Sequence, residues 1–302
     1  MNYKGLASKA WLVLVISVLL ALPEVFVTRG RSAQKSKTPP PVPETLLKRT
    51  TTRRESQRLG YGGTVTIVGA PAGSITIEGW PRSEVEVVAD IELKGANEDD
   101  LNRLAAVNNF LFDSDSNHVS ILTTGVHDKA FMRRSTKNFP KNLLSLPWKI
   151  DYRIRLPAVT DLEINGGRGA IKLSGVEGAI RLSSVEGETN LVLTGGVVSA
   201  TVAAGNVVVN VPARSWRGTG ADIRVAAGTL TLELPPGFNG DIDADILKAG
   251  RIEDNYGSLE SRERPGLTQT VMRARAGVGG PFFKFTVGVG TVSIRKIEPG
   301  KK

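Results

Sequence analysis

Glycine recurs with a period of nine residues in the middle of the chain, at positions 169, 178, 187, 196 and 205. Divided at these glycines, the sequence becomes five consecutive units: GAIKLSGVE, GAIRLSSVE, GETNLVLTG, GVVSATVAA and GNVVVNVPA. The second and fourth positions after each glycine are mostly aliphatic, and the seventh completes the pattern with Val176, Val185, Thr194, Ala203 and Pro212. A fixed period with recurring apolar positions is typical of stacked structural repeats.

Each unit is long enough for a strand of about five residues and a turn at the glycine. Nine residues are too few to close a coil, so we expect two units per coil, about 18 residues, with glycines and aliphatic side chains stacked in ladders. The sequence therefore predicts an all-β fold, a parallel β-solenoid of the β-helix or β-roll type. A meander of antiparallel hairpins in a sandwich is the alternative; the low aromatic content of 6% favours the solenoid.

The flanks of the repeat carry weaker signals. Short runs of alternating apolar and polar residues between 63 and 93 predict half-buried strands. One short helix is expected after Asn97, a suitable N-cap, with Leu101 and Leu104 on its buried face. Strands are expected again at 110–112, 119–122, 230–234 and 283–294. Residues 125–148 are basic and predict a long mobile loop, whose role the sequence leaves open.

Residues 1–30 predict an export signal. Lys4 and Lys9 precede thirteen apolar residues, 10–22, and Pro23 and Glu24 end the run. As a helix this run would span about 20 Å, short of the roughly 30 Å of a bilayer core, which favours a cleaved signal peptide. An uncleaved membrane anchor over residues 10–27 is the alternative. Residues 31–60, rich in proline and arginine, predict an extended linker. We therefore expect an exported protein of the cell envelope, in the periplasm or on the surface.

The net charge of +9 is concentrated at the N-terminus. Residues 1–60 contain eleven Lys or Arg and three Glu, whereas the remaining chain is nearly neutral. A neutral, glycine-rich domain lacks the basic surface that binding to a phosphate backbone requires, so we expect no nucleic-acid partner. The basic N-terminal segment fits contact with a membrane or an acidic wall polymer better.

Several segments resemble one bacterial family. They are the repeated GAIxLSxVE, residues 152–157 (YRIRLP), 161–164 (DLEI), 74–80 (SITIEGW) and 290–296 (GTVSIRK). Together they resemble the bacterial putative-adhesin domain, a domain of unknown function, over residues 61–298. The resemblance implies an envelope-associated β-solenoid with an adhesive role, and it offers no catalytic residues to carry over.

Candidate chemistry is sparse. The chain has no cysteine and two histidines, which excludes disulfides, thiolate metal sites and a cysteine nucleophile. Asp241, Asp243 and Asp245 alternate like the start of a calcium loop, but glycine and glutamate are missing at the sixth and twelfth positions. We interpret them as the solvated face of a strand; the alternatives are a weak cation site and a polysaccharide-cleaving carboxylate pair formed by Asp243 and Asp245 on one face of the strand.

Other motifs are equally weak. His127 and Asp128 have no accompanying nucleophile elbow, and the glycine-rich residues 277–280 and 288–290 fit turns better than phosphate loops. Trp80, Trp148 and Trp216 could stack on sugars if exposed, or cap the core. The sequence therefore predicts no catalytic residue, no metal ligand and no cofactor.

The function expected from these observations is non-enzymatic binding or adhesion at the cell envelope. The ligand is unknown from the sequence; a cell-wall or surface polysaccharide and an envelope protein are the candidates, with membrane contact through the N-terminal segment. A polysaccharide-active β-helix enzyme and a membrane-anchored periplasmic scaffold or stress-response factor are the alternatives.

Overall fold

Short segments with alternating apolar and polar residues form strands along the chain, as predicted. The computed structural model describes residues 46–115, 117–136, 138–264 and 266–297. In β4 (Glu84–Gly95), for example, every second residue is buried and its neighbours are half-buried. The described residues form seventeen strands, two α-helices and one 3-10 helix, so the fold is all-β.

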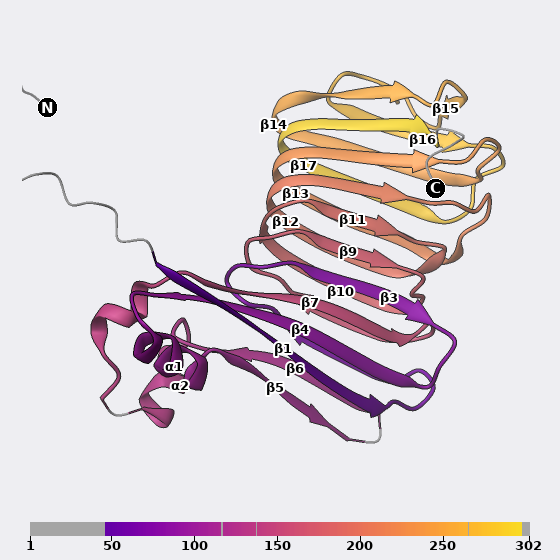
Figure 1. Ribbon diagram of the computed structural model, residues 1–302. Coiled ribbons are helices and arrows are strands. Elements are labelled where there is room, and N and C mark those ends of the chain that lie inside the picture. Colours follow the sequence, from indigo (N-terminus) through magenta and orange to yellow (C-terminus); the bar gives the residue numbers. More distant parts are fainter. Residues whose placement is uncertain (1–45, 116, 137, 265, 298–302) are drawn as a thin grey trace, which may run out of the picture. The chain divides into compact units, whose positions relative to one another are not determined.

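The remaining elements follow in chain order (Figure 1). The strands are β1 (Leu47–Arg58), β2 (Thr64–Val68), β3 (Ile75–Trp80), β5 (Asn109–Ser114), β6 (His118–Thr124), β7 (Trp148–Pro157), β8 (Asp161–Asn165), β9 (Ile171–Ser174), β10 (Ala179–Glu186), β11 (Thr189–Val192), β12 (Gly195–Asn210), β13 (Arg217–Leu234), β14 (Gly240–Asn255), β15 (Leu259–Ser261), β16 (Val271–Ala276) and β17 (Phe282–Lys296). The helices are α1 (Glu98–Val107), α2 (Lys129–Ser135) and the 3-10 helix η1 (Lys141–Ser145).

None of the helices in the described ranges combines the length and the apolar character needed to cross a membrane. The predicted signal or anchor, residues 1–30, lies outside the described residues.

Parallel pairing dominates the middle of the domain. Strands β2, β8, β10, β12, β13, β17 and β14 follow one another in parallel register, and Figure 1 shows β10, β12, β13, β17 and β14 stacked in this order. Leu162 pairs with Ile180, and Ile180 pairs with Val198, each 18 residues further along. This is the offset expected for two nine-residue units. The offset widens to 23 residues between β12 and β13, where Val198 meets Ala221.

A second parallel series runs through β3, β9, β11 and the C-terminal halves of the long strands β12, β13, β17 and β14. Its inward row includes Ile171, Thr189, Val207 and Leu230, aligned by the pairing. The inward rows of both series are buried in one hydrophobic core. Aliphatic ladders, in which each side chain packs on its equivalent in the next strand, therefore form this core.

Glycines form a ladder where the long strands pass from the first series to the second. Seven of them stack in the order 73, 169, 187, 205, 228, 290 and 250, all with φ between +126° and +151°. At Gly205 a Cβ would collide with the carbonyl oxygen of Gly187 on the neighbouring strand. Glycine is required there for two reasons: the backbone conformation is unfavourable for other residues, and the strands approach too closely for a side chain.

Outer strands pair differently, which limits the predicted parallel arrangement. Strand β4 lies between β1 and β7 with antiparallel pairing on both sides, and β5 pairs antiparallel with β6. At the other end, β16 is antiparallel to both β14 and β15. The sheet therefore has mixed strand orientation, because the strands at its ends are connected by turns and helices rather than by the glycine-punctuated repeat.

Two sequence expectations are corrected at the N-terminal end. Residues 47–58 of the predicted linker form β1, paired along its whole length with β4. Its side chains are polar on both faces, so hydrophobic periodicity could not detect it. Residues 125–148, expected as a mobile loop, form α2 and η1, with Met132 and Leu143 buried. The single predicted helix is present as α1, capped by Asn97 as expected.

The prediction that the seventh position of the repeat belongs to its apolar pattern is also wrong for most units. Val176 is buried, but Val185 is half exposed, and the sixth-position residues Ser184, Leu193 and Val202 point inward instead. Because alternate residues of a strand face the same side, the second, fourth and sixth positions belong together. In the first unit Gly175, with φ +68°, shifts the chain by one residue and turns Val176 inward.

Candidate binding face

One outward surface combines aligned polar side chains with shallow hollows. We call it the A face: the outward residues of β8, β10, β12, β13 and β17. Parallel register places its side chains in two rows, Glu163–Arg181–Ser199–Asp222–Lys284 and Asn165–Ser183–Thr201–Arg224–Thr286. Neighbouring side chains in a row are separated by the strand spacing of about 4.8 Å. The A face is thus a flat array of hydrogen-bonding groups.

Two hollows lie side by side on the A face and share Ser199. The smaller, of about 120 Å³, is lined by Glu163, Arg181 and Ser183 among others. The larger, of about 510 Å³, lies over Gly220, where a side chain is missing between Val197 and Phe282.

Apolar surface borders the larger hollow. Val197 is 54% exposed and Phe282 is 41% exposed. The guanidinium of Arg262 lies 5.7 Å from the centre of the Phe282 ring and helps to hold the ring in place. A partly exposed aromatic ring beside polar side chains is an arrangement that can bind the apolar and polar sides of a sugar together.

Charges on the A face are only partly neutralised. Arg224 forms a bidentate pair with Asp222, which raises the pKa of Arg224. Glu163, Arg181 and Lys284 make no ion pair with any described residue. These three side chains can therefore exchange water for the groups of a ligand without breaking an internal contact.

The three aspartates of β14 are occupied by arginines, so their interpretation as a solvated face is wrong. Asp241 binds Arg275, Asp243 binds Arg262, and Asp245 binds Arg273 at 2.8 Å. Hydrogen bonding from Arg275 lowers the pKa of Asp241. Its contribution to stability is therefore present at neutral pH and is lost only as the pH falls through that lowered value. The carboxylates form structural ion pairs that join β14 to the neighbouring strand β16 and to Arg262, which follows β15.

His127 and Asp128 are brought together with no nucleophile. Asp128 is the N-cap of α2 and accepts hydrogen bonds from the backbone N–H groups of Ala130 and Phe131; these lower the pKa of its carboxyl. The His127 ring packs on Trp148, and partial desolvation lowers its pKa. The described residues include no serine hydrogen-bonded to His127. The pair is a helix start and a stacking contact.

The tryptophans lie in the walls of the core. Trp216 is buried, and its Nε1–H donates to the carbonyl of Gly196. Trp80 is half-buried and donates to the carbonyl of Glu84, with Arg82 over its ring. Sugar stacking through Trp216 is therefore excluded by its burial. The glycine-rich residues 277–280 form a turn as expected, whereas residues 288–290 lie within β17.

The A face is not among the sites predicted from the sequence, although the sequence contains a signal for it. Glu163, Arg181 and Ser199 each occupy the same outward position of neighbouring parallel strands, 18 residues apart. Their alignment follows from the repeat period. Lys284 and Phe282 could not be added in this way, because β17 is brought beside β13 by a long connection through β14 and β16.

Comparisons with known proteins give distant neighbours only. No family model matches the chain, and no curated protein matches it. Among solved structures, it is similar to a putative cell adhesion protein from Clostridium sporogenes, at 12% identity and a TM-score of 0.44, covering 82% of this chain and 100% of that one. It is also similar to a putative adhesin from Bacteroides fragilis, at 9% identity and a TM-score of 0.34, covering 82% and 97%. With TM-scores below 0.5, neither likeness identifies the family or the ligand of this chain.

Proposed function

We propose that this chain is a non-enzymatic, adhesion-type binding protein of the cell envelope. Its parallel section is a β-solenoid, and its A face binds an extended, hydroxyl-rich polymer, a cell-wall or surface polysaccharide. The observation that carries the proposal is the pair of hollows joined at Ser199, flanked by the unpaired charges of Arg181 and Lys284 and by the Phe282 ring.

The shape of this surface supports a long ligand. A row of side chains crosses successive strands at a constant spacing, so a polymer lying across the strands meets a new donor or acceptor at each step. Ser199, Thr201 and Asp222 supply hydroxyl and carboxylate groups for sugar hydroxyls. A small compact ligand would use only a fraction of this array.

Support for a binding role over catalysis comes from the aspartates. The carboxylates that could have formed an acid–base pair, Asp243 and Asp245, are held by Arg262 and Arg273. Because their oxygens already bind guanidinium groups, these carboxylates would have to break an ion pair before they could contact a substrate.

A binding assay tests the proposal. The full chain is added to insoluble peptidoglycan and to immobilised alginate, alongside the variants Phe282→Ala and Arg181→Ala. We expect retention on at least one polymer and a loss of affinity of about tenfold for Phe282→Ala, as for a central aromatic contact. Lys172→Ala is the matched control, since Lys172 is exposed on β9 in the other parallel series.

Three results would contradict the proposal. Retention on neither polymer would rule out a polysaccharide ligand. A loss of affinity for Lys172→Ala as large as that for Phe282→Ala would rule out the A face as the binding surface. Release of new reducing ends during the incubation would favour the polysaccharide-active enzyme instead.

Location is tested separately by protease treatment of intact cells. Digestion of the domain from outside fits an adhesion-type surface protein. Protection until the outer layer is opened would favour a periplasmic scaffold, and sequencing of the mature N-terminus in the same preparation would decide between signal peptide and anchor.

A further inference from the structure

Helices α2 and η1 carry a cluster of basic side chains without acidic partners. Lys129, Arg133, Arg134 and Lys141 are exposed, and none of them makes an ion pair with a described residue. The only acidic residue in the surrounding segment 125–148 is Asp128, whose carboxylate caps α2. We call these four residues, together with the exposed Leu144, the helical-end surface.

The basic residues of the neighbouring sheet behave differently. Lys48 binds Glu92 at 2.8 Å, and Arg153 binds Asp90 at 2.9 Å across β1, β4 and β7. Across β1, β4 and β7 these basic side chains are therefore neutralised, whereas those of the helical-end surface make no ion pair with a described residue. An anionic partner would meet four positive charges there, with the Asp128 carboxylate, on which Arg134 acts electrostatically, as the acidic group of this segment.

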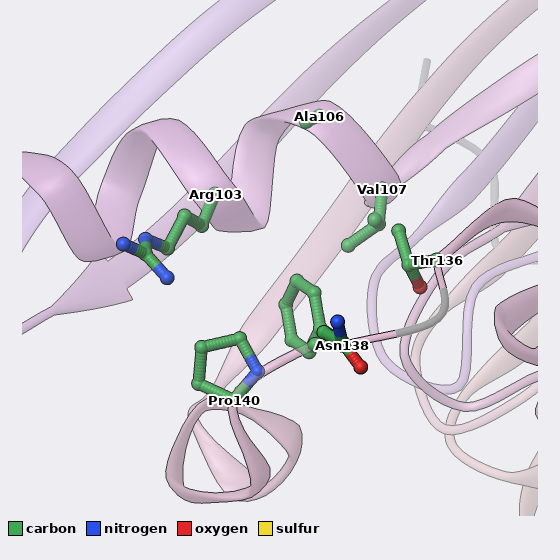
Figure 2. Close-up of a pocket in the computed structure, with 7 residues that line it drawn as sticks. Arg103, Ala106, Val107, Thr136, Asn138 and Pro140 are labelled. Atoms are coloured by element: carbon green, nitrogen blue, oxygen red, sulfur yellow. The ribbon is translucent and has the colours of Figure 1, made fainter.

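Apolar side chains lie between these charges. Leu144 is 43% exposed and, with Val126 and Met132, lines a hollow of about 560 Å³ whose rim is formed by Lys129 and Arg133. A second hollow of about 330 Å³ separates α1 from the segment after α2 (Figure 2). Its lining is mainly apolar: Ala106, Val107, Phe139 and Pro140, with Arg103, Thr136 and Asn138 at its edges.

The combination of basic and apolar groups distinguishes between anionic partners. A polysaccharide would satisfy the charges but leave Leu144 and the apolar hollows in water. The headgroup region of an anionic bilayer satisfies both, because lysine and arginine bind the headgroups while apolar side chains enter the acyl boundary.

The entry point of the chain lies at the same end of the domain. The first residue of β1, Leu47, pairs with Gly95, just before α1. Arg49 then donates to Asn102 at 2.9 Å and pairs with Glu98, both on α1. The sequence preceding this point contains the apolar residues 10–22 and the basic linker.

We propose that the helical-end surface rests on the surface of an anionic lipid bilayer. This contact is independent of the polysaccharide binding proposed for the A face, because the A face lies on β8, β10, β12, β13 and β17 and the helical-end surface lies on α2 and η1. It adds a membrane-facing side to the domain, next to the point where the N-terminal segment joins β1.

A single fluorescent label tests this contact in the full chain. Because the chain has no cysteine, Leu144→Cys provides a unique site for an environment-sensitive fluorophore. The labelled protein is mixed with phosphatidylcholine vesicles that contain or lack phosphatidylglycerol. The control is Leu247→Cys, since Leu247 is 66% exposed on β14 at the other end of the parallel series.

We expect a blue-shifted emission and quenching by lipid-attached nitroxide for the label at position 144 in anionic vesicles, and neither effect at position 247. Neutralising Arg133→Gln and Lys141→Gln together should reduce the docked fraction relative to the undocked one by roughly fivefold for each charge removed. The matched pair Lys248→Gln and Arg214→Gln, exposed elsewhere in the domain, should change nothing.

Two results would overturn the proposal. Labels at positions 144 and 247 that behave alike in anionic vesicles would show that any attachment occurs through the N-terminal segment alone. A shift at position 144 produced by soluble alginate without vesicles, and no quenching by lipid nitroxide, would identify a polysaccharide surface instead.

Discussion

The parallel middle of this domain and its antiparallel ends are stabilised by different means. In the middle, equivalent residues of parallel-paired strands stack, so aliphatic side chains form the core and glycines form one corner. At the ends, charged strands lie across the stack: β1 and β7 place lysine and arginine beside the acidic β4, and β16 places arginine beside the aspartates of β14. The hydrophobic core continues under both regions, and the ends add rows of complementary charge to it.

Charged strands at the ends have a physical reason, which is the exposed edge of a parallel sheet. A parallel stack can accept further strands at either end, and unpaired backbone groups there would invite association with other chains. Charged antiparallel strands end the pairing. Their side chains form ion pairs with one partner strand, and burying these charges against the apolar edge of another chain would be unfavourable. At both ends of the domain, antiparallel strands therefore follow the parallel pairing.

The largest effect is expected from a charge in the aliphatic ladder. Ile180 is 1% exposed and lies between Leu162 and Val198, so Ile180→Asp would bury an unpaired carboxylate. We expect a loss of about 4 kcal/mol or more in the free energy of unfolding. Guanidinium denaturation measures it. The adjacent exposed Arg181→Asp should change stability by less than about 0.5 kcal/mol; equal effects of the two would refute the register.

A methyl group in the glycine ladder should be the next most damaging change. Gly205→Ala would place its Cβ against the backbone of Gly187, and we expect a loss of about 3 kcal/mol. Gly62→Ala in the N-terminal section is the control: Gly62 has φ +68°, but a Cβ there meets no atom within 4 Å. That variant should lose only about 1 kcal/mol, the cost of the backbone conformation. Thermal unfolding of the pair compares a stacked with an isolated glycine.

Removing one aspartate at a time compares the stabilising effect of an ion pair at the β14–β16 end with that of an ion pair in the parallel middle. Asp243→Ala leaves Arg262 and Arg273, whose side chains are 20% and 24% exposed, without this carboxylate. We expect a loss of about 2 kcal/mol in chemical denaturation. Asp222→Ala removes an exposed pair with Arg224 in the middle and should cost about 0.5 kcal/mol or less. If Asp243→Ala were as stable as the wild type, the interpretation of these aspartates as a solvated face would be correct after all.

The smallest effect expected is a gain. Thr189 is fully buried between Ile171 and Val207, and its hydroxyl has no hydrogen-bond partner among the described residues. Thr189→Val keeps the shape, removes the unsatisfied group and should stabilise the domain by about 1 kcal/mol. A rise in Tm of a few degrees is the expected readout. A fall would mean that the hydroxyl is satisfied by water in solution.

Prediction from sequence was accurate where a residue type is required by the local backbone conformation. The nine-residue glycine period led to the 18-residue pairing offset of β8, β10 and β12, and Asn97 marked the start of α1. Prediction failed where the stabilising partner is distant. The polar β1 is a strand because β4 pairs with it, and Asp243 is neutralised by arginines that follow it by 19 and 30 residues.

The sequence by itself determined the strands of the repeat, the positions of its tight corners and the composition of the core ladders, because these depend on local backbone geometry and on the period of apolar residues. Only the tertiary structure decided which charges are neutralised and which are free. That outcome depends on side chains meeting across strands and helices far apart in the chain. It is this difference that leaves Arg181 and Lys284 available on the A face, and Lys129, Arg133, Arg134 and Lys141 available at the helical end.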